Sequence, residues 1–294
     1  MAKKATAEAH LEAIAKGAIE PGCAKVDPIL VADNVTRTFG GLTAVNVAHV
    51  EIPRGKITAL IGPNGAGKTT LFNLLTGFDK PNTGSWNFEG RQLAGVAPHK
   101  VARWGMVRTF QLTKALSLLT VLDNMRLGAQ DNPGEGFFRA FVKPVWAAKE
   151  KEITERAEAL LKRFKLDAKS EDYAAALSGG QRKLLEMARA LMSDPKLVML
   201  DEPMAGVNPA LTQSLLEHIK GLKEHGTTVL FVEHDMHMVR HISDWVIVMA
   251  EGKIVAEGPP GDVMKNQAVI DAYLGAHADV DLGTVSIDTV RESK

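Results

Sequence analysis

The residues with the clearest chemical meaning lie at positions 62–69, where the chain reads Gly-Pro-Asn-Gly-Ala-Gly-Lys-Thr. This run fits the pattern G-x-x-x-x-G-K-[ST], in which backbone N–H groups converge on phosphates because the glycines carry no Cβ. An apolar run precedes it at residues 57–61 and an apolar-faced helix is predicted after it, which is the setting that this chemistry requires. The predicted phosphate-binding residues are Gly62, Pro63, Asn64, Gly65, Ala66, Gly67, Lys68, Thr69 and Thr70.

Two side chains of this loop are predicted to act on the phosphates directly. The ammonium group of Lys68 would neutralise the β- and γ-phosphates of a nucleoside triphosphate, and the Thr69 hydroxyl would ligate Mg²⁺. The amino terminus of the following helix adds a favourable field for anions. The segment therefore predicts a site for ATP and Mg²⁺.

Two carboxylates follow a short apolar run at residues 197–200 that reads as a buried strand. A carboxylate at the carboxyl end of a parallel strand lies in the ligand crevice of an α/β sheet. Asp201 is predicted to hold Mg²⁺ through water, since this ion keeps much of its hydration. Glu202 is predicted to be the general base that activates the attacking water.

A histidine follows a second apolar run, residues 227–232. A single histidine at a strand end is often structural. His234, however, lies one helix and one strand beyond Asp201, at the same end of the presumed sheet. It is therefore predicted to contact the γ-phosphate and the attacking water.

The elements that must position these residues alternate along the chain. Strands that alternate with helices predict a parallel sheet covered on both faces. Before them, residues 29–31, 44–52 and 57–61 have strand patterns, with turns at Gly40-Gly41 and at residues 53–55. Strands are predicted at residues 197–200, 227–232 and 245–249, and helices at 68–77, 148–164, 178–192, 210–225 and 236–242.

The composition of the 294-residue chain excludes several classes of protein. Lys plus Arg and Asp plus Glu both number 35, which argues against a dedicated nucleic-acid binder. The single cysteine, Cys23, cannot form an internal disulfide, which suits a reducing compartment. No window reaches the ~18 apolar residues of a membrane-spanning helix. We therefore expect any membrane role to come through a partner.

The sequence Leu-Ser-Gly-Gly-Gln at residues 177–181 points to a family. By itself it could be a loop that caps a helix at Ser178. Placed after a phosphate loop and before an Asp-Glu strand end, it resembles the signature motif of ABC-transporter ATPases, and the resemblance covers about residues 29–260. It implies an α/β fold: a P-loop NTPase parallel-sheet core, an antiparallel β subdomain and an inserted helical subdomain at about residues 112–187. The expected boundaries are a flexible extension at residues 1–27, the ATPase domain at 28–275 and a tail at 276–294.

The resemblance also assigns residues that have little specificity of their own. Phe39 resembles the aromatic residue that stacks on adenine, although it could equally be a strand core residue. Gln111 resembles the glutamine that reaches Mg²⁺ and links the core to the helical subdomain. Two ATPase domains of this family pack head to tail, so that the signature of one closes over the ATP of the other. The residues implied in this contact are Ser178, Gly179, Gly180 and Gln181.

A finer resemblance is to the ATPases of branched-chain (hydrophobic) amino-acid importers. It rests on residues 40–45, 202–209, 233–236 and 269–275. It implies ATP hydrolysis that powers alternating access in two membrane permease subunits, supplied by a substrate-binding protein, at the cytoplasmic face of the cell membrane. The chain carries one phosphate loop and one signature, so a second ATPase is needed, and the resemblance implies a heterodimer. At Asn208 many ABC ATPases have Asp, which puts charge-based coupling between the two sites in doubt.

Other functions stay open at this point. A urea or amide importer shares much of the pattern, and an exporter is separated only by the family-like segments. A soluble ABC ATPase of DNA repair or translation would carry coiled-coil arms or two cassettes, and no sustained heptads occur between Gln111 and Ser178. A non-catalytic scaffold predicts loss of Lys68, Glu202 or His234, and all three are present.

Overall fold

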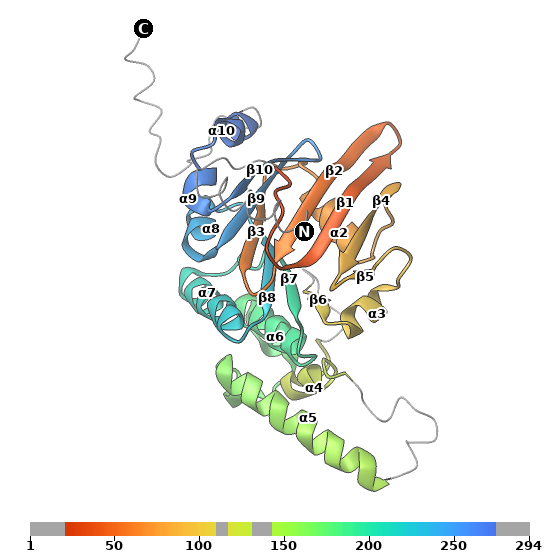
Figure 1. Cartoon of the computed structure of the whole chain (residues 1–294). Coiled ribbons are helices and arrows are strands. Elements are labelled where there is room, and N and C mark those ends of the chain that lie inside the picture. The colour runs from red at the N-terminus through yellow and green to blue at the C-terminus, as the bar shows by residue number, and fades with distance from the viewer. Residues whose placement is uncertain (1–20, 110–116, 131–142, 275–294) are drawn as a thin grey trace. The chain divides into compact units, whose positions relative to one another are not determined.

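The computed structural model describes residues 21–109, 117–130 and 143–274 (Figure 1). The described residues fall into two compact units. The first contains the described residues 21–98 and 226–274, and the second contains the described residues between 99 and 225. In these described parts, no helix is both long and apolar enough to cross a membrane.

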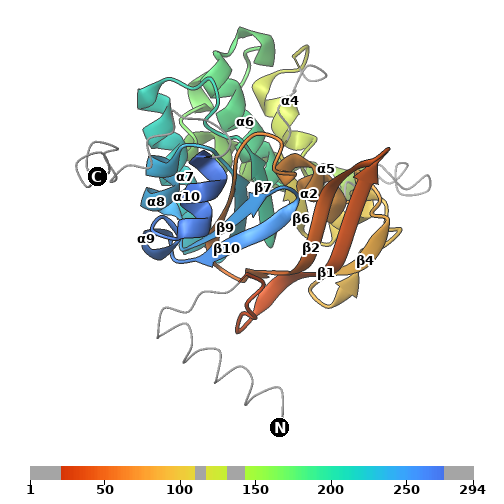
Figure 2. The same cartoon turned by 90° about the horizontal axis from the view of Figure 1, so that it is seen from above.

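An antiparallel sheet forms one layer of the first unit, with its strands in the order β2-β1-β4-β5. Figure 2 shows the first three of these strands side by side. The longest pair of the sheet turns at Gly40-Gly41, as predicted, where Phe39 pairs with Leu42. Leu30 and Ala32 of the first strand are buried at alternate positions, and Val35 is buried where the pairing with β4 shifts in register between Asp33 and Thr36. The strands are β1 (Pro28–Phe39), β2 (Leu42–Pro53), β4 (Thr83–Phe88) and β5 (Arg91–Gln92).

Parallel strands form the core of the same unit. The strand β3 (Ile57–Ile61) is buried at every position and pairs in parallel with β8 (Thr228–Val232) and β9 (Trp245–Ala250). A continuous apolar run is what a strand covered on both faces requires. The antiparallel strand β10 (Lys253–Gly258) follows β9. The helices of this unit are α2 (Lys68–Leu75), α8 (Met236–Ile242), α9 (Pro260–Val263) and α10 (Gln267–Leu274).

The second unit combines two parallel strands with helices. The helix predicted at residues 148–164 is confirmed, and the buried side chains Ile153, Ala157, Leu161 and Phe164 have the spacing of one helix face. The helix begins earlier than predicted, at Lys143. The elements are α3 (Pro98–Arg103), β6 (Met106–Arg108), α4 (Val121–Arg126), α5 (Lys143–Arg163), η4 (Asp167–Lys169), η5 (Ala174–Ala176), α6 (Gly179–Leu191), β7 (Leu197–Asp201) and α7 (Pro209–Glu224).

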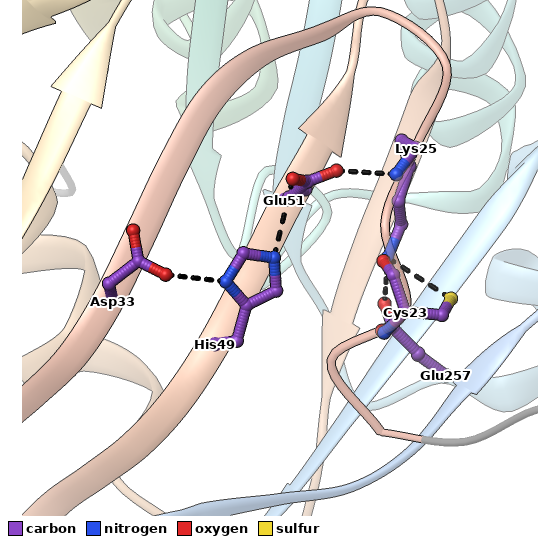
Figure 3. A network of polar contacts seen from close by, with 6 residues as sticks. All are labelled: Cys23, Lys25, Asp33, His49, Glu51 and Glu257. Atoms are coloured by element: carbon purple, nitrogen blue, oxygen red, sulfur yellow. Dashed lines mark hydrogen bonds and ion pairs between the residues drawn. The ribbon is translucent and has the colours of Figure 1, made fainter. Parts of the chain in front are cut away.

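The N-terminal segment, residues 21–27, is anchored by a polar network in the first unit (Figure 3). The Nζ of Lys25 lies 2.6 Å from Oε2 of Glu257, whose side chain is fully buried. The backbone N–H of Cys23 and the indole Nε1–H of Trp245 donate to the same carboxylate, at 2.7 and 3.0 Å. The backbone N–H of Lys25 donates to Glu51. These bonds hold the segment between β2 and β10 (Figure 3).

This network corrects part of the expected flexible extension at residues 1–27. The sequence could not indicate it, because Lys25 and Glu257 are 232 positions apart. A carboxylate that is completely buried needs a paired cation and donated hydrogen bonds, and this segment supplies both. Residues 1–20 and the expected tail at 276–294 lie outside the described residues.

Candidate active site

The phosphate loop joins β3 to α2 with a backbone path that two of its glycines make possible. A Cβ on Gly62 would lie 2.1 Å from the carbonyl oxygen of Met249. A Cβ on Gly67, which precedes α2 at φ 97°, would lie 2.2 Å from the carbonyl oxygen of Ala44. Both contacts are far inside van der Waals distance, so only glycine fits. The loop thus has the bare backbone that a phosphate cradle requires.

The charge of Lys68 is held against this loop. Its Nζ donates to the carbonyl oxygens of Gly62 and Pro63, at 2.6 and 2.9 Å. The first turn of α2, which the structure describes in full, carries no acidic side chain that would oppose an anion. Thr69 is exposed and Thr70 half-buried at the start of the same helix.

His234 lies at the same sheet edge as the phosphate loop. Strands β3 and β8 are parallel, with Leu60 paired to Val232, so Gly62 and His234 each stand two residues beyond a paired position. The His234 side chain is 65% exposed, and its Nδ1 is 3.9 Å from Oε2 of the buried Glu233. The structure therefore brings the histidine to the edge that the sequence predicted.

Phe39 ends β1 with its ring exposed. Its relative exposure is 48%, which excludes the alternative of a strand core residue. The guanidinium carbon of Arg37 lies 4.4 Å from the ring centroid. An exposed ring already stacked by a cation is a suitable platform for a planar base.

Asp201, predicted to hold Mg²⁺, and Glu202, the predicted general base, lie at the end of β7 in the second unit. Asp201 accepts a hydrogen bond on Oδ2 from Nη2 of Arg108 at 2.7 Å, and both side chains are about nine-tenths buried or more. No role was predicted for Arg108, since an arginine on a short strand carries no signal for this pairing. Glu202 follows with a φ of 45°, the left-handed region that non-glycine residues rarely adopt. Such strained residues concentrate at functional sites.

The signature residues begin α6. Ser178 is the N-cap: its hydroxyl accepts from the backbone N–H of Gln181 at 3.3 Å, and Oε1 of Gln181 accepts from the backbone N–H of Ser178 at 3.0 Å. This reciprocal capping box fixes the loop. Gly179 is exposed, whereas Gly180 is buried against Leu211, where a Cβ would lie 2.6 Å from Cδ1. Gly180 thus has a packing role that the sequence did not indicate. Gln111 lies outside the described residues.

Comparison with known proteins identifies the family. Residues 45–205, more than half of the chain, match the ABC transporter family. The chain belongs to the ABC transporter family. Residues 253–279 of this ABC ATPase also match the family described as branched-chain amino acid ATP-binding cassette transporter. The resemblance stated from the signature motif is therefore confirmed.

Relatives of this ABC ATPase are similar over nearly their whole length. It is 43% identical to the probable branched-chain amino acid transport ATP-binding protein LivG of Archaeoglobus fulgidus, over 87% of this chain and 99% of the relative. It is 40% identical to the high-affinity branched-chain amino acid transport ATP-binding protein BraF of Pseudomonas aeruginosa, over 84% of this chain and 98% of the relative.

Solved structures agree on the fold. A nucleotide-free ATP-binding cassette from an ABC transporter matches with a TM-score of 0.73 and 37% identity, over 84% of this chain and 98% of that one. An ATP-binding cassette of an ABC transporter in its ADP conformation matches with a TM-score of 0.74 and 37% identity, over 84% of this chain and 99% of that one. The predicted α/β P-loop fold is confirmed, and the chain is an ATPase that binds nucleotide. The roles of individual site residues stay predictions.

Proposed function

We propose that this ABC ATPase is the energy-supplying subunit of a branched-chain amino-acid importer. The observation that carries the proposal is the match of residues 253–279 to the branched-chain amino-acid family, since these residues lie beyond the phosphate loop and signature that all ABC ATPases share. The relatives named for branched-chain amino-acid transport support it. Hydrolysis would drive alternating access in two membrane permease subunits, at the cytoplasmic face of the cell membrane, with a substrate-binding protein supplying the cargo.

In this proposal the first unit binds ATP. The backbone N–H groups of residues 62–70 surround the phosphates, and Lys68 exchanges its carbonyl partners for phosphate oxygens. The exposed ring of Phe39 stacks on the base. His234, at the same sheet edge, donates to the γ-phosphate and orients the attacking water.

The residues that would hold Mg²⁺ are Thr69, Gln111 and Asp201. They offer hydroxyl, amide and carboxylate oxygens, the donor types that Mg²⁺ prefers, so the donor set fits the ion. When bound, the ion neutralises charge on the β- and γ-phosphate oxygens. Arg108 fixes the orientation of the Asp201 carboxylate through one of its two oxygens.

Hydrolysis then depends on Glu202. Its carboxylate accepts a proton from the attacking water as the new bond to the γ-phosphorus forms, while the bond from that phosphorus to the β–γ bridging oxygen breaks and ADP leaves. Ser178 and Gly179 are exposed at the amino terminus of α6, where N–H groups and the helix dipole favour an anion. In a head-to-tail pair they would serve the nucleotide of the second ATPase, which we take to be a different, related chain.

Reconstitution tests this function. The chain is combined in liposomes with its proposed partner ATPase and permease subunits, and uptake of labelled leucine is measured with the binding protein and ATP. We expect leucine uptake that stops with the Glu202→Gln variant. Uptake of urea or amides alone, or export of leucine, would contradict the proposed cargo or direction while leaving the ATPase intact.

A further inference from the structure

Lys183 connects the signature helix to the turn that carries Glu202. It is half-buried on α6, five residues after Ser178. Its Nζ donates to the carbonyl oxygen of Ala205 at 2.5 Å and to that of Glu202 at 3.2 Å. Hydrogen bonds from an ammonium group are stronger than neutral ones, so this lysine is a strong local constraint on the turn.

The turn itself is an improbable backbone path. Glu202 has a φ of 45°, and Gly206 has a φ of 70°. Within it, the backbone N–H of Ala205 donates to the carbonyl oxygen of Glu202 at 3.1 Å. A non-glycine residue stays in the left-handed region only where its surroundings determine it. The bonds from Lys183 to Glu202 and Ala205 meet this requirement on both sides of the turn.

The turn borders an open pocket rather than a filled core. The pocket has a volume of about 230 Å³ and is lined by Lys183, Glu186, Asp201 and Ala205 among others. Among the described residues beside this pocket, Lys183 is the one that bonds to both ends of the Glu202–Ala205 turn.

The same helix touches the far end of the turn. Asn208 caps α7 by accepting from the backbone N–H of Leu211 at 2.9 Å. Leu211 in turn packs on Gly180 so closely that a Cβ on the glycine would lie 2.6 Å from it. Helix α6 thus contacts the turn at Lys183 and the start of α7 at Gly180.

We infer that Lys183 is a positioning residue for hydrolysis, which holds Glu202 in its strained conformation and couples it to the signature of the same chain. The inference rests on the proposed function, in which Glu202 serves the nucleotide bound by its own chain and the signature serves the nucleotide of the partner. Lys183 touches neither nucleotide, and acts through the carbonyl oxygens of Glu202 and Ala205. It provides a physical connection by which closure over one nucleotide aligns the base at the other.

The test uses the full chain assembled with its partner ATPase and permeases. Lys183→Met removes the charge and keeps much of the side-chain volume, Lys183→Arg restores the charge, and Lys162→Met on the exposed face of α5 is the matched control. We expect Lys183→Met to lower kcat by about 10²-fold, the typical cost of displacing a reacting group by 1 Å. The KM for ATP and the affinity for a fluorescent ATP analogue should stay within about twofold. Lys183→Arg should recover most of kcat.

A double-mutant cycle with Glu202→Gln separates the possible failures. If Lys183 acts through Glu202, adding Lys183→Met to Glu202→Gln slows hydrolysis no further. The inference would be overturned if Lys183→Met lowered kcat by the same factor in the Glu202→Gln chain as in the wild-type chain. It would also be overturned if Lys183→Met alone left kcat unchanged. A fall in kcat that Lys183→Arg does not rescue, with weaker ATP binding and a lower Tm, would show a merely structural lysine. Full activity of Glu202→Gln alone would instead reject the proposed role of Glu202.

Discussion

Gly62 and Gly67 shape the phosphate loop for a steric reason, and Lys68 gives it charge. The glycines approach the carbonyl oxygens of Met249 and Ala44 so closely that no side chain fits. The loop therefore presents backbone N–H groups, while the ammonium of Lys68 rests on two loop carbonyls that phosphate oxygens can replace. The Lys68 ammonium would therefore bind either the loop carbonyl oxygens or the phosphate oxygens of the nucleotide.

Lys68→Ala should weaken nucleotide binding itself. Removing one charged hydrogen-bonding group costs about 1.5–3 kcal/mol, which corresponds to roughly a 10- to 100-fold higher Kd. Lys68→Arg should recover little, because a planar guanidinium does not reproduce a compact ammonium. Titration with a fluorescent ATP analogue measures this, with Lys80→Ala, an exposed lysine, as the control. An unchanged Kd for Lys68→Ala would refute the assignment of the loop.

At the scale of elements, the N-terminal segment is held to the first unit by Lys25. This side chain pairs with the fully buried Glu257, and its Nζ also lies 5.1 Å from the ring centroid of Trp245. Burial and the neighbouring carboxylate of Glu257 raise the pKa of the Cys23 thiol to about 11. The thiol is thus protonated and poorly reactive at neutral pH, which makes it a sensor for the packing of this segment.

Lys25→Met should destabilise the protein by about 3 kcal/mol, because it leaves a buried carboxylate without its cation. The Glu257 carboxylate keeps two donated hydrogen bonds, so the loss stays at the low end of the range for buried pairs. Urea denaturation measures it, and adding Glu257→Gln should restore part of the loss. Lys151→Met, at an exposed pair, is the control.

Labelling of Cys23 adds a second readout for this variant. Loss of Lys25 by itself would make the thiol still less acidic, since the lysine lowers the Cys23 pKa. Faster labelling of Lys25→Met at pH 8 therefore indicates detachment of the segment. Equal stability and equally slow labelling of variant and wild type would contradict an anchoring role.

A ring contact packs helix α7 against the residue that follows α5. The ring of His218 stacks on Phe164 with centroids 4.1 Å apart. Burial lowers the pKa of His218, and the nearby cations Arg163 and Lys165 lower it further. The folded protein therefore favours the neutral imidazole.

This contact predicts a loss of stability in mild acid. Because the folded pKa lies below the unfolded value of about 6.5, the contribution of His218 is complete above that pH and is lost as the pH falls through the folded pKa. His218→Phe should flatten this part of the decline in unfolding free energy between pH 7.5 and 5. Parallel curves for variant and wild type, measured by urea denaturation, would exclude the contribution.

At the scale of the whole molecule, each copy of the chain carries one phosphate loop and one signature. In the proposed head-to-tail pair, a complete site would combine the loop of one chain with Ser178 of another. We expect this pair to be weak unless membrane subunits hold both halves at high effective concentration. Its formation would then be a property of the assembly rather than of the isolated chain.

We predict that the working pair is a heterodimer. The isolated chain should be mostly monomeric and slow in ATP hydrolysis, because Ser178 has no nucleotide opposite it. Sedimentation with Mg-ATP on the Glu202→Gln background tests this, and addition of the partner ATPase and permeases should produce the dimer and the activity. A stable homodimer, whose wild-type form hydrolyses ATP briskly, would reject the heterodimer and leave the ATPase assignment intact.

Local patterns predicted much of the fold. The helix expected at residues 236–242 is α8, and the strand expected at 57–61 is β3, because apolar period and flanking turns are properties of neighbouring residues. The strand β4 escaped prediction, since its sequence Thr-Gly-Ser-Trp-Asn-Phe has weak strand propensity and it pairs with β1, far back in the chain. The strand β6 is only three residues long and is stabilised by pairing with β7.

Local sequence was enough to predict the phosphate loop, the Asp-Glu strand end and the signature, because each is a short run whose chemistry depends on adjacent residues. The distant groups that support them became visible in the folded chain. Arg108 meets Asp201 across 93 positions, and Lys183 meets Glu202 across 19. Buried charges and strained backbone need partners that the chain supplies from elsewhere, and folding alone determines which residues those are.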